Sequence, residues 1–383
     1  MVPHYIKVAP LALCIAASSV SAQETDAERI DKLEQRVNSL QQQATSSAAD
    51  RVRLNGFFST GYARADNDAG FAGITEESEV ADLSLMALQG TFSINDDTKA
   101  VMQLVSRGVQ DWDTELEWAY LSHQLTNDLQ IRAGKMRLPF FMYSDSLEVG
   151  YAQPWARPPQ AVYGPVTINS YVGADATYIY SLGGSAITTQ VFSGFTDETG
   201  ATTGTQVEFR NTFGLNTEWT DYVWKARAII ATAETSIQPA NGPALADGDR
   251  GNFYGLGFGY DDGKWQVVSE VTRIDVDGAF ADTDSAYLTV ARRINSLTPY
   301  VSVGWIESTD DEDRAGPLTV LNTSRDEYSL GMRWDVLSGV AVKFDWTYVT
   351  GFENDPGGLN AAGVIGDDLD STNVYTVKID SAF

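Results

Sequence analysis

The chain has 383 residues, with 52 acidic and 26 basic side chains and a formal net charge of −26. A protein this acidic is repelled by phosphates, so nucleic acid is excluded as a partner. The single cysteine, Cys14, lies close to the N-terminus, so disulfides and cysteine-based catalysis or metal sites are excluded for the rest of the chain. We therefore expect no cofactor and no metal. The 17 Tyr, 16 Phe and 9 Trp residues need a structural explanation.

Residues 1–22 have the pattern of a secretory signal peptide. Lys7 precedes an apolar run from Val8 to Ala17, and the small-residue sequence VSA ends at Ala22. The run is shorter than the roughly 20 residues that a membrane-spanning helix needs. We predict secretion with cleavage after Ala22; the alternative is an N-terminal anchor helix.

Residues 23–50 are polar and rich in Gln. They carry four apolar residues at spacings of three, four and three, which form the a/d seam of two heptads: Ile30, Leu33, Val37 and Leu40. This pattern predicts a short coiled-coil segment that associates with other copies of the chain. Two heptads are fewer than the three or four that argue strongly for a coiled coil, so a frayed helix is the alternative.

From Arg51 onward, apolar and polar side chains alternate with the period of two that indicates β-strands. Near the end of the chain, Leu330 and Trp334 share one face, and Arg333 and Asp335 share the other. Many runs have 10 to 14 residues, which suits strands that cross a bilayer at a tilt. Sixteen such runs begin near residues 52, 80, 99, 114, 128, 172, 185, 205, 222, 252, 264, 284, 298, 325, 340 and 373.

The connections between these runs sort by length. Those after odd-numbered runs are mostly long, and the longest, residues 138–171, follows the fifth run; those after even-numbered runs are tight turns such as NDD, TND and LSG. Long external loops that alternate with short periplasmic turns are typical of outer-membrane barrels, whereas a soluble sandwich has no reason to sort its loops. An even strand number also closes an antiparallel sheet without an edge in lipid. We predict an all-β, sixteen-stranded transmembrane barrel over residues 51–383.

Basic side chains within the runs alternate with the aromatic ones. A Lys or Arg that faced lipid at the middle of the bilayer would cost about 2–4 kcal/mol. The barrel interior is therefore predicted to be wet and charged, and the basic residues expected to line it are Arg107, Arg132, Arg210, Lys225, Arg227, Arg333 and Lys343.

The ending NVYTVKIDSAF places Tyr375, Val377, Ile379 and the terminal Phe383 in one alternating row. It resembles the assembly signal of Gram-negative outer-membrane barrels. With sixteen strands, a signal peptide and one outsized loop, residues 51–383 resemble a trimeric bacterial porin. The segment GKMRLPFFMYSDSLEVGYAQPWARPP is similar to that of a porin subfamily with an N-terminal coiled coil. The resemblance implies a homotrimer that barrel-assembly machinery inserts into outer-membrane lipid and that passes small hydrophilic solutes.

The resemblance also implies that residues 138–171 fold into the pore and narrow it, with acids that face the basic wall. Asp145 and Glu148 are the candidate acids, or else solvated loop residues; the family's usual PEFGG-like turn is missing. Arg157 is a candidate either to bind solute or to pair with a carboxylate of the wall. Four aromatic residues offer either a stacking surface for a solute or packing that fixes the loop: Tyr143, Tyr151, Trp155 and Tyr163.

Several functions stay open at this point. The channel is either a general diffusion pore or one that prefers a sugar, an aromatic compound or an organic acid. An outer-membrane enzyme would need a base beside a nucleophile, and the only histidine after residue 22 is His123, near a periplasmic turn. A third alternative is an adhesin or tether that uses the coiled coil. The acidic residues 310–313 are either a solvated loop or a divalent-cation site that bridges to lipopolysaccharide.

Overall fold

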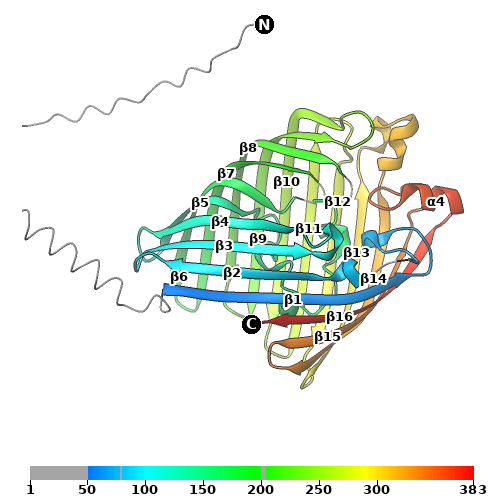
Figure 1. Ribbon diagram of the computed structural model, residues 1–383. Coiled ribbons are helices and arrows are strands. Elements are labelled where there is room, and N and C mark those ends of the chain that lie inside the picture. Colours follow the sequence, from blue (N-terminus) through cyan, green and yellow to red (C-terminus); the bar gives the residue numbers. More distant parts are fainter. Residues whose placement is uncertain (1–50, 78–79, 167, 200–203) are drawn as a thin grey trace, which may run out of the picture. The chain divides into compact units, whose positions relative to one another are not determined.

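The computed structural model describes residues 51–383 apart from 78–79, 167 and 200–203. Over this part of the chain, sixteen antiparallel strands form one closed barrel, as the sequence predicts (Figure 1). The predicted signal peptide and coiled-coil seam lie outside the described residues: residues 1–22, and Ile30, Leu33, Val37 and Leu40.

The elements follow one another without crossovers. The strands are β1 (Val52–Ala65), β2 (Leu85–Ser93), β3 (Thr98–Arg107), β4 (Thr114–Gln124), β5 (Leu129–Arg137), β6 (Ser170–Leu182), β7 (Ser185–Thr199), β8 (Gln206–Thr220), β9 (Trp224–Gln238), β10 (Ala246–Asp261), β11 (Trp265–Val276), β12 (Thr283–Arg292), β13 (Leu297–Ser308), β14 (Ser324–Leu337), β15 (Val340–Thr350) and β16 (Ser371–Ala382). The short helices lie in the connections: η1 (Phe71–Gly73), η2 (Val80–Leu83), η3 (Gly108–Gln110), η4 (Ser144–Ser146), η5 (Gly150–Ala152), α3 (Gln160–Tyr163), η6 (Asp311–Asp313), η7 (Gly316–Leu321) and α4 (Ala361–Asp367).

Each strand pairs with its neighbours in sequence, and β1 closes the barrel by pairing with β16. This last register runs from Phe57 opposite Ala382 to Ala65 opposite Val374. At its end, Phe383 and Gly56 exchange two backbone hydrogen bonds of 2.9 and 2.8 Å. The Phe383 ring lies over Gly56, where a Cβ atom would come within 2.5 Å of it. The closed sheet therefore has no free strand edge.

The outer wall of the barrel is apolar. The C-terminal row Tyr375, Val377, Ile379 and Phe383 is exposed there, and the alternate β16 residues face inward. Other large exposed side chains are Tyr254, Leu256, Phe258, Leu330, Trp334, Phe344 and Trp346. An apolar surface of this extent suits lipid rather than water. Among the described residues, helices are too short or too polar to cross a membrane.

A bulge in β8 corrects one prediction of side-chain direction. The pairing of β8 with β9 shifts between Arg210 and Phe213, and Asn211 has a φ of 50°. The shift reverses the alternation, so Phe209 packs toward the interior whereas Phe213 is exposed outside. Arg210 is opposite Glu234 and its side chain is 67% exposed. The prediction that Arg210 lines the interior is therefore wrong, because it assumed uninterrupted alternation.

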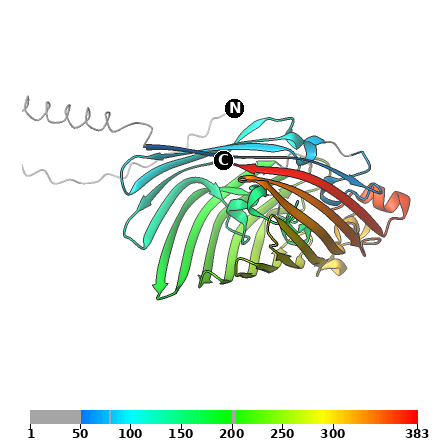
Figure 2. The ribbon, with the colours of Figure 1, turned by 90° about the horizontal axis from the view of Figure 1, so that it is seen from below.

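The connection between β5 and β6, residues 138–169, folds into the barrel. In the view from below, this teal segment lies within the ring of strands (Figure 2). We call it the inner loop. It carries η4, η5 and α3, and the main apolar core of the protein forms where it packs against the inner wall.

Candidate functional site

The inner loop is held first by aromatic packing. Phe140 stacks on Phe253 of β10, with ring centroids 4.6 Å apart and an interplanar angle of 11°. Phe141 packs against both Phe253 and Tyr163, at centroid distances of 5.6 and 4.7 Å. Trp155 makes edge contacts with Tyr143 and with Tyr287 of β12. Of the aromatic residues predicted in this segment, Tyr143, Trp155 and Tyr163 thus fix the loop.

One wall carboxylate ties two limbs of the inner loop together. Glu270 of β11 is 2% exposed and accepts a hydrogen bond of 2.8 Å from the backbone N–H of Met142. It also accepts from the hydroxyl groups of Tyr163, at 2.5 Å, and of Tyr287, at 2.9 Å. Residues 142 and 163 lie at opposite ends of the loop, so Glu270 sets the distance between them.

Four basic residues of the inner wall bind the loop backbone: Arg227, Arg333, Lys343 and Lys378. Arg227 donates to the carbonyl oxygens of Pro139 and Phe140, the latter at 3.0 Å. Arg333 donates to the carbonyl oxygen of Tyr151 at 2.5 Å, and its guanidinium lies 4.6 Å from the centroid of the Tyr151 ring. Lys378 of β16 adds a contact of 3.2 Å to the loop carbonyl oxygen at residue 156.

Lys343 is the most enclosed of the predicted wall residues, with a side chain that is 0% exposed. Its Nζ donates to the carbonyl oxygens of Gly150 and Trp155, at 2.6 and 2.8 Å, and pairs with Asp380 at 2.8 Å. A Cβ atom on Gly150 would come within 2.0 Å of Asp380, so only glycine allows this approach. Arg227, Arg333 and Lys343 therefore act as clamps under the loop, because each of them donates to carbonyl oxygens of the loop.

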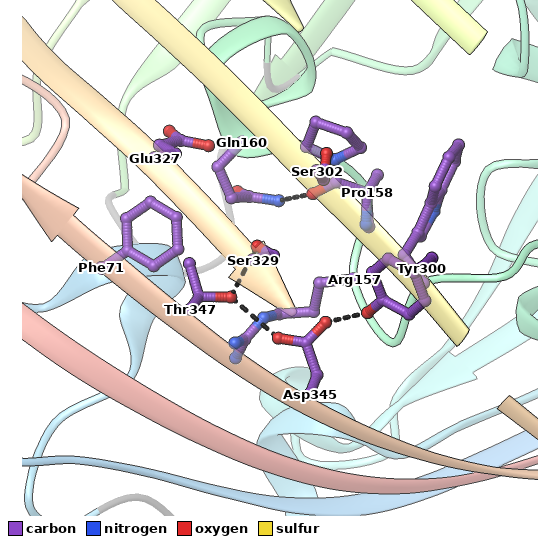
Figure 3. Close-up of a pocket in the computed structure, with 12 residues that line it drawn as sticks. Phe71, Arg157, Pro158, Gln160, Tyr300, Ser302, Glu327, Ser329, Asp345 and Thr347 are labelled. Carbon is purple, nitrogen blue, oxygen red and sulfur yellow. Dashed lines mark hydrogen bonds between the residues drawn. The ribbon is translucent and has the colours of Figure 1, made fainter. Parts of the chain in front are cut away.

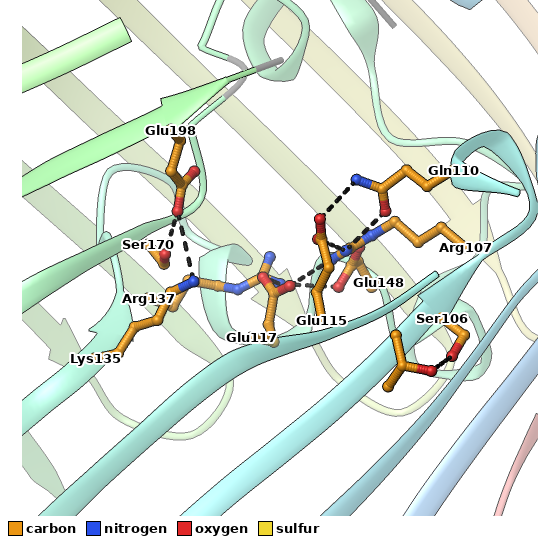
Figure 4. Close-up of polar contacts among 11 residues, drawn as sticks. Ser106, Arg107, Gln110, Glu115, Glu117, Lys135, Arg137, Glu148, Ser170 and Glu198 are labelled. Carbon is orange, nitrogen blue, oxygen red and sulfur yellow. Dashed lines mark hydrogen bonds and ion pairs between the residues drawn. The ribbon is translucent and has the colours of Figure 1, made fainter. Parts of the chain in front are cut away.

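On the other side of the loop, Glu148 joins a network of charges (Figure 4). Arg107 donates to Glu148 at 2.7 Å and to Glu117 at 2.5 Å. Arg137 donates to the same two carboxylates, at 2.9 and 2.6 Å. Burial by itself would raise the pKa of Glu148, but the charges of Arg137 and Arg107 outweigh it and lower that pKa below its ordinary value.

Asp145 lies only three residues from Glu148 but is exposed and is not part of that network. It is within electrostatic range of Arg132 on β5. Arg132 itself forms a two-pronged pair with Asp175 of β6, with a shortest distance of 2.6 Å. Lys225, at the start of β9, is 39% exposed and pairs with Glu218 at 3.2 Å. Asp145 and Lys225 face water, in contrast to the clamps.

Arg157 lines a small cavity between the inner loop and the wall formed by β13, β14 and β15 (Figure 3). Its Nη1 and Nη2 atoms are buried and have no hydrogen-bond partner within the described parts of the chain. Asp345 lies beside the guanidinium but accepts hydrogen bonds from the hydroxyl groups of Tyr300 and Thr347 instead. Burial lowers the pKa of Arg157, and the charge of Asp345 opposes that effect. The expected pairing of Arg157 with a wall carboxylate is therefore incomplete.

A larger cavity of about 270 Å³ adjoins this one on the side of the long loops. The two cavities share Phe71, from η1, and Gln160 of the inner loop. The walls of the larger cavity are mainly apolar: Phe71, Pro165, Leu245, Phe280, Ile306 and Leu321. We call the two together the double cavity.

Other candidates from the sequence lie away from this region. His123, near the end of β4, is hydrogen-bonded to Thr98 at 2.9 Å. In the acidic run 310–313, Asp310 and Asp311 pair with Arg314 at 2.6 and 2.8 Å. The described residues contain no cluster of three His, Cys, Asp or Glu side chains arranged to hold a metal ion.

Sequence reasoning did not single out Glu117, Glu270, Lys378 or Asp380, which hold the loop or its clamps. Their inward position in an alternating strand was readable for Glu270 and Asp380. The contact of the loop with these residues was not predictable, because no pattern within the strand itself indicates it.

Solved structures with this fold are outer-membrane channels. They include Salmonella typhi OmpF in complex with daunomycin, with a TM-score of 0.59 and 12% identity over 87% of this chain and 97% of that one. The anion-selective porin from Comamonas acidovorans has a TM-score of 0.55 and 16% identity, covering 87% and 99%. The channel DcaP of Acinetobacter baumannii has a TM-score of 0.55 and 12% identity, covering 87% and 97%. At these identities the likeness concerns the porin fold; no protein-family model and no curated protein sequence matches.

Proposed function

We propose that the chain is an outer-membrane porin that passes small hydrophilic solutes and ions passively. The observation that carries this proposal is a closed barrel with an apolar outer wall, an inner wall that carries the buried charged residues of the strands, and a long loop folded inside. Lipid outside and water inside is the environment in which this distribution of side chains is stable. The likeness to porin structures supports the same function.

The inner loop is the constriction of this pore. Water-facing charges near it are Asp145 and Lys225, and rings of charge together with pore width set selectivity in channels. No step in this function requires a nucleophile or a base. The hydrogen bond between His123 and Thr98 gives an enzymatic alternative no support.

The mature protein is proposed to be a homotrimer, delivered by cleavage near Ala22 and inserted by barrel-assembly machinery that reads the C-terminal row. Residues 23–50 would associate as a periplasmic coiled coil. Lipid covers the outer wall and lipopolysaccharide meets the long loops. In the acidic run 310–313, Arg314 already neutralises part of the charge, which favours a loop stabilised by ion pairs over a divalent-cation bridge.

Planar-bilayer recording of the purified protein tests the porin function. We expect stable stepwise conductance, and a reversal potential under a salt gradient that reports ion selectivity. A folded protein that produces no conductance in repeated insertions would contradict the proposal. A second candidate, a channel that prefers one class of solute, is favoured by the unpaired guanidinium of Arg157.

A further inference from the structure

We propose that the double cavity binds a zwitterionic amino acid with an apolar side chain. This inference rests on the porin function and names a substrate class for the same loop. The small cavity measures about 20 Å³ and the larger one about 270 Å³, and the larger one is close to the lower end of the range for small-molecule sites.

The carboxylate of the solute is recognised by Arg157. Both Nη atoms of this side chain are buried without a partner among the described residues, whereas a buried charge is ordinarily paired and hydrogen-bonded. A guanidinium binds a carboxylate through two parallel hydrogen bonds, which gives strength and orientation. The nearby hydroxyl groups of Ser329 and Thr347 are hydrogen-bonded to each other at 2.9 Å and are not partners of Arg157.

The charge balance of the site selects a zwitterion over a simple anion. Arg157, Glu327 and Asp345 line the small cavity, and Arg325 lines the large one and donates to Glu327 at 3.1 Å. Two positive and two negative groups thus balance before any solute enters. An added anion alone would leave a net charge in a site with little water, which is costly. The ammonium group of an amino acid restores the balance by facing Asp345 or Glu327.

The apolar side chain of the solute fits the larger cavity. Phe71 stands at the boundary between the two cavities, and Phe280, Leu245 and Ile306 form walls further along. An amino acid held at its charged end by Arg157 and Asp345 would extend past Phe71 into this region. Removing an apolar side chain from water contributes roughly 25 cal/mol per Å² of buried area.

Titration calorimetry of the folded protein in detergent tests the site with four probes: L-phenylalanine, phenylacetate, phenethylamine and glucose. L-phenylalanine is expected to bind at least about tenfold more tightly than any of the others, because it alone supplies both charges and the apolar group. Equal binding of phenylacetate and L-phenylalanine would overturn the zwitterion assignment. Absence of binding by all four would overturn the site.

Three variants assign the effect to residues. Arg157→Gln is expected to weaken L-phenylalanine binding about ten- to a hundredfold. Arg157→Lys should retain only part of the wild-type affinity, because an ammonium group cannot make the two parallel hydrogen bonds of a guanidinium. Asp345→Asn should remove the preference for L-phenylalanine over phenylacetate. Arg210→Gln, on the outer wall, is the matched control and should bind as the wild type does. Wild-type affinity in Arg157→Gln would overturn the assignment.

Ion-current block in planar bilayers separates the two proposals. Added L-phenylalanine should reduce wild-type current at concentrations that leave Arg157→Gln unaffected. A channel that conducts without binding L-phenylalanine refutes the amino-acid site and leaves the porin standing. A protein that binds L-phenylalanine without conducting refutes the porin function and keeps the site.

Discussion

Lys343 and Lys225 are both basic residues of the inner wall, on opposite parts of the barrel. Lys343 is 0% exposed, and its ammonium is surrounded by two loop carbonyl oxygens and Asp380. Lys225 is 39% exposed and has a single carboxylate partner, Glu218. The same inward position thus makes one lysine a structural clamp and leaves the other to act on ions in the water. Whether the inner loop covers the lysine side chain decides between these two roles.

Replacing Lys343 by Met should have the largest effect. It leaves Asp380 and the carbonyl oxygens of Gly150 and Trp155 short of a donor in a buried region. Breaking a buried ion pair in this way costs about 3–5 kcal/mol, to be measured as the loss of free energy of unfolding in urea. Lys225→Met is the control and should cost less than about 1 kcal/mol, since exposed pairs contribute little. Equal losses would erase the distinction between the two lysines.

Acidification should release the loop through Glu148. A lowered carboxyl pKa stabilises docking fully above the ordinary value of 4.5, and this contribution is lost as the pH falls through the lowered pKa. Open-channel current noise should therefore be constant from pH 7 to about pH 5 and rise at more acidic pH. Glu148→Gln should show raised noise already at pH 7.

Asp145→Asn provides the comparison for this titration, because Asp145 is exposed in the same loop. It should keep the quiet current of the wild type at pH 7. Noise that is raised equally by both substitutions would mean that the Arg107–Arg137–Glu148 network does not hold the loop.

Lys225→Gln should change selectivity without changing the loop. Loss of a water-facing positive charge favours cations, and screening at about 0.1 M salt limits the change in permeability ratio to roughly twofold. The measurement is the reversal potential under a salt gradient, at low and high ionic strength. A shift that persists unchanged at 1 M salt would contradict a simple charge effect.

Arg210→Gln should have the smallest effect. Its side chain is on the outer surface and pairs with Glu208 at 2.6 Å, so stability should change by no more than about 0.5 kcal/mol. Conductance and reversal potential should match the wild type. A change in selectivity comparable to that of Lys225→Gln would return Arg210 to the pore.

The strands were predictable because a tilted crossing of the bilayer imposes both the length and the period of each run. The prediction differs from the structure at the start of β10, which begins at Ala246 rather than near residue 252 because this stretch of Gly and Asp shows no alternation. One residue in the sequence is consistent with the bulge in β8: Asn211 has a left-handed conformation, which Asn tolerates better than most residues.

The candidate site was less predictable than the fold. The sequence identified residues 138–171 as the unusual loop. It also identified Arg157 as a basic residue of that loop whose role, solute binding or pairing with the wall, was open. Which wall groups meet the loop depends on contacts between segments far apart in sequence, such as Met142 with Glu270. Alternation reports whether a side chain points inward, but it carries no information about what covers that side chain.

The pairing of β1 with β16 has a consequence for the order of folding. The hydrogen bond from Ser59 to Asp380 joins residues separated by 321 positions, so forming it requires closure of nearly the whole chain. Contacts of such long range form late and slowly. Asp380 is also the partner of Lys343 and lies against Gly150. The contacts of the inner loop with Asp380 and Lys378 therefore form only after the last strand has arrived, so this part of its anchoring is completed when the barrel closes.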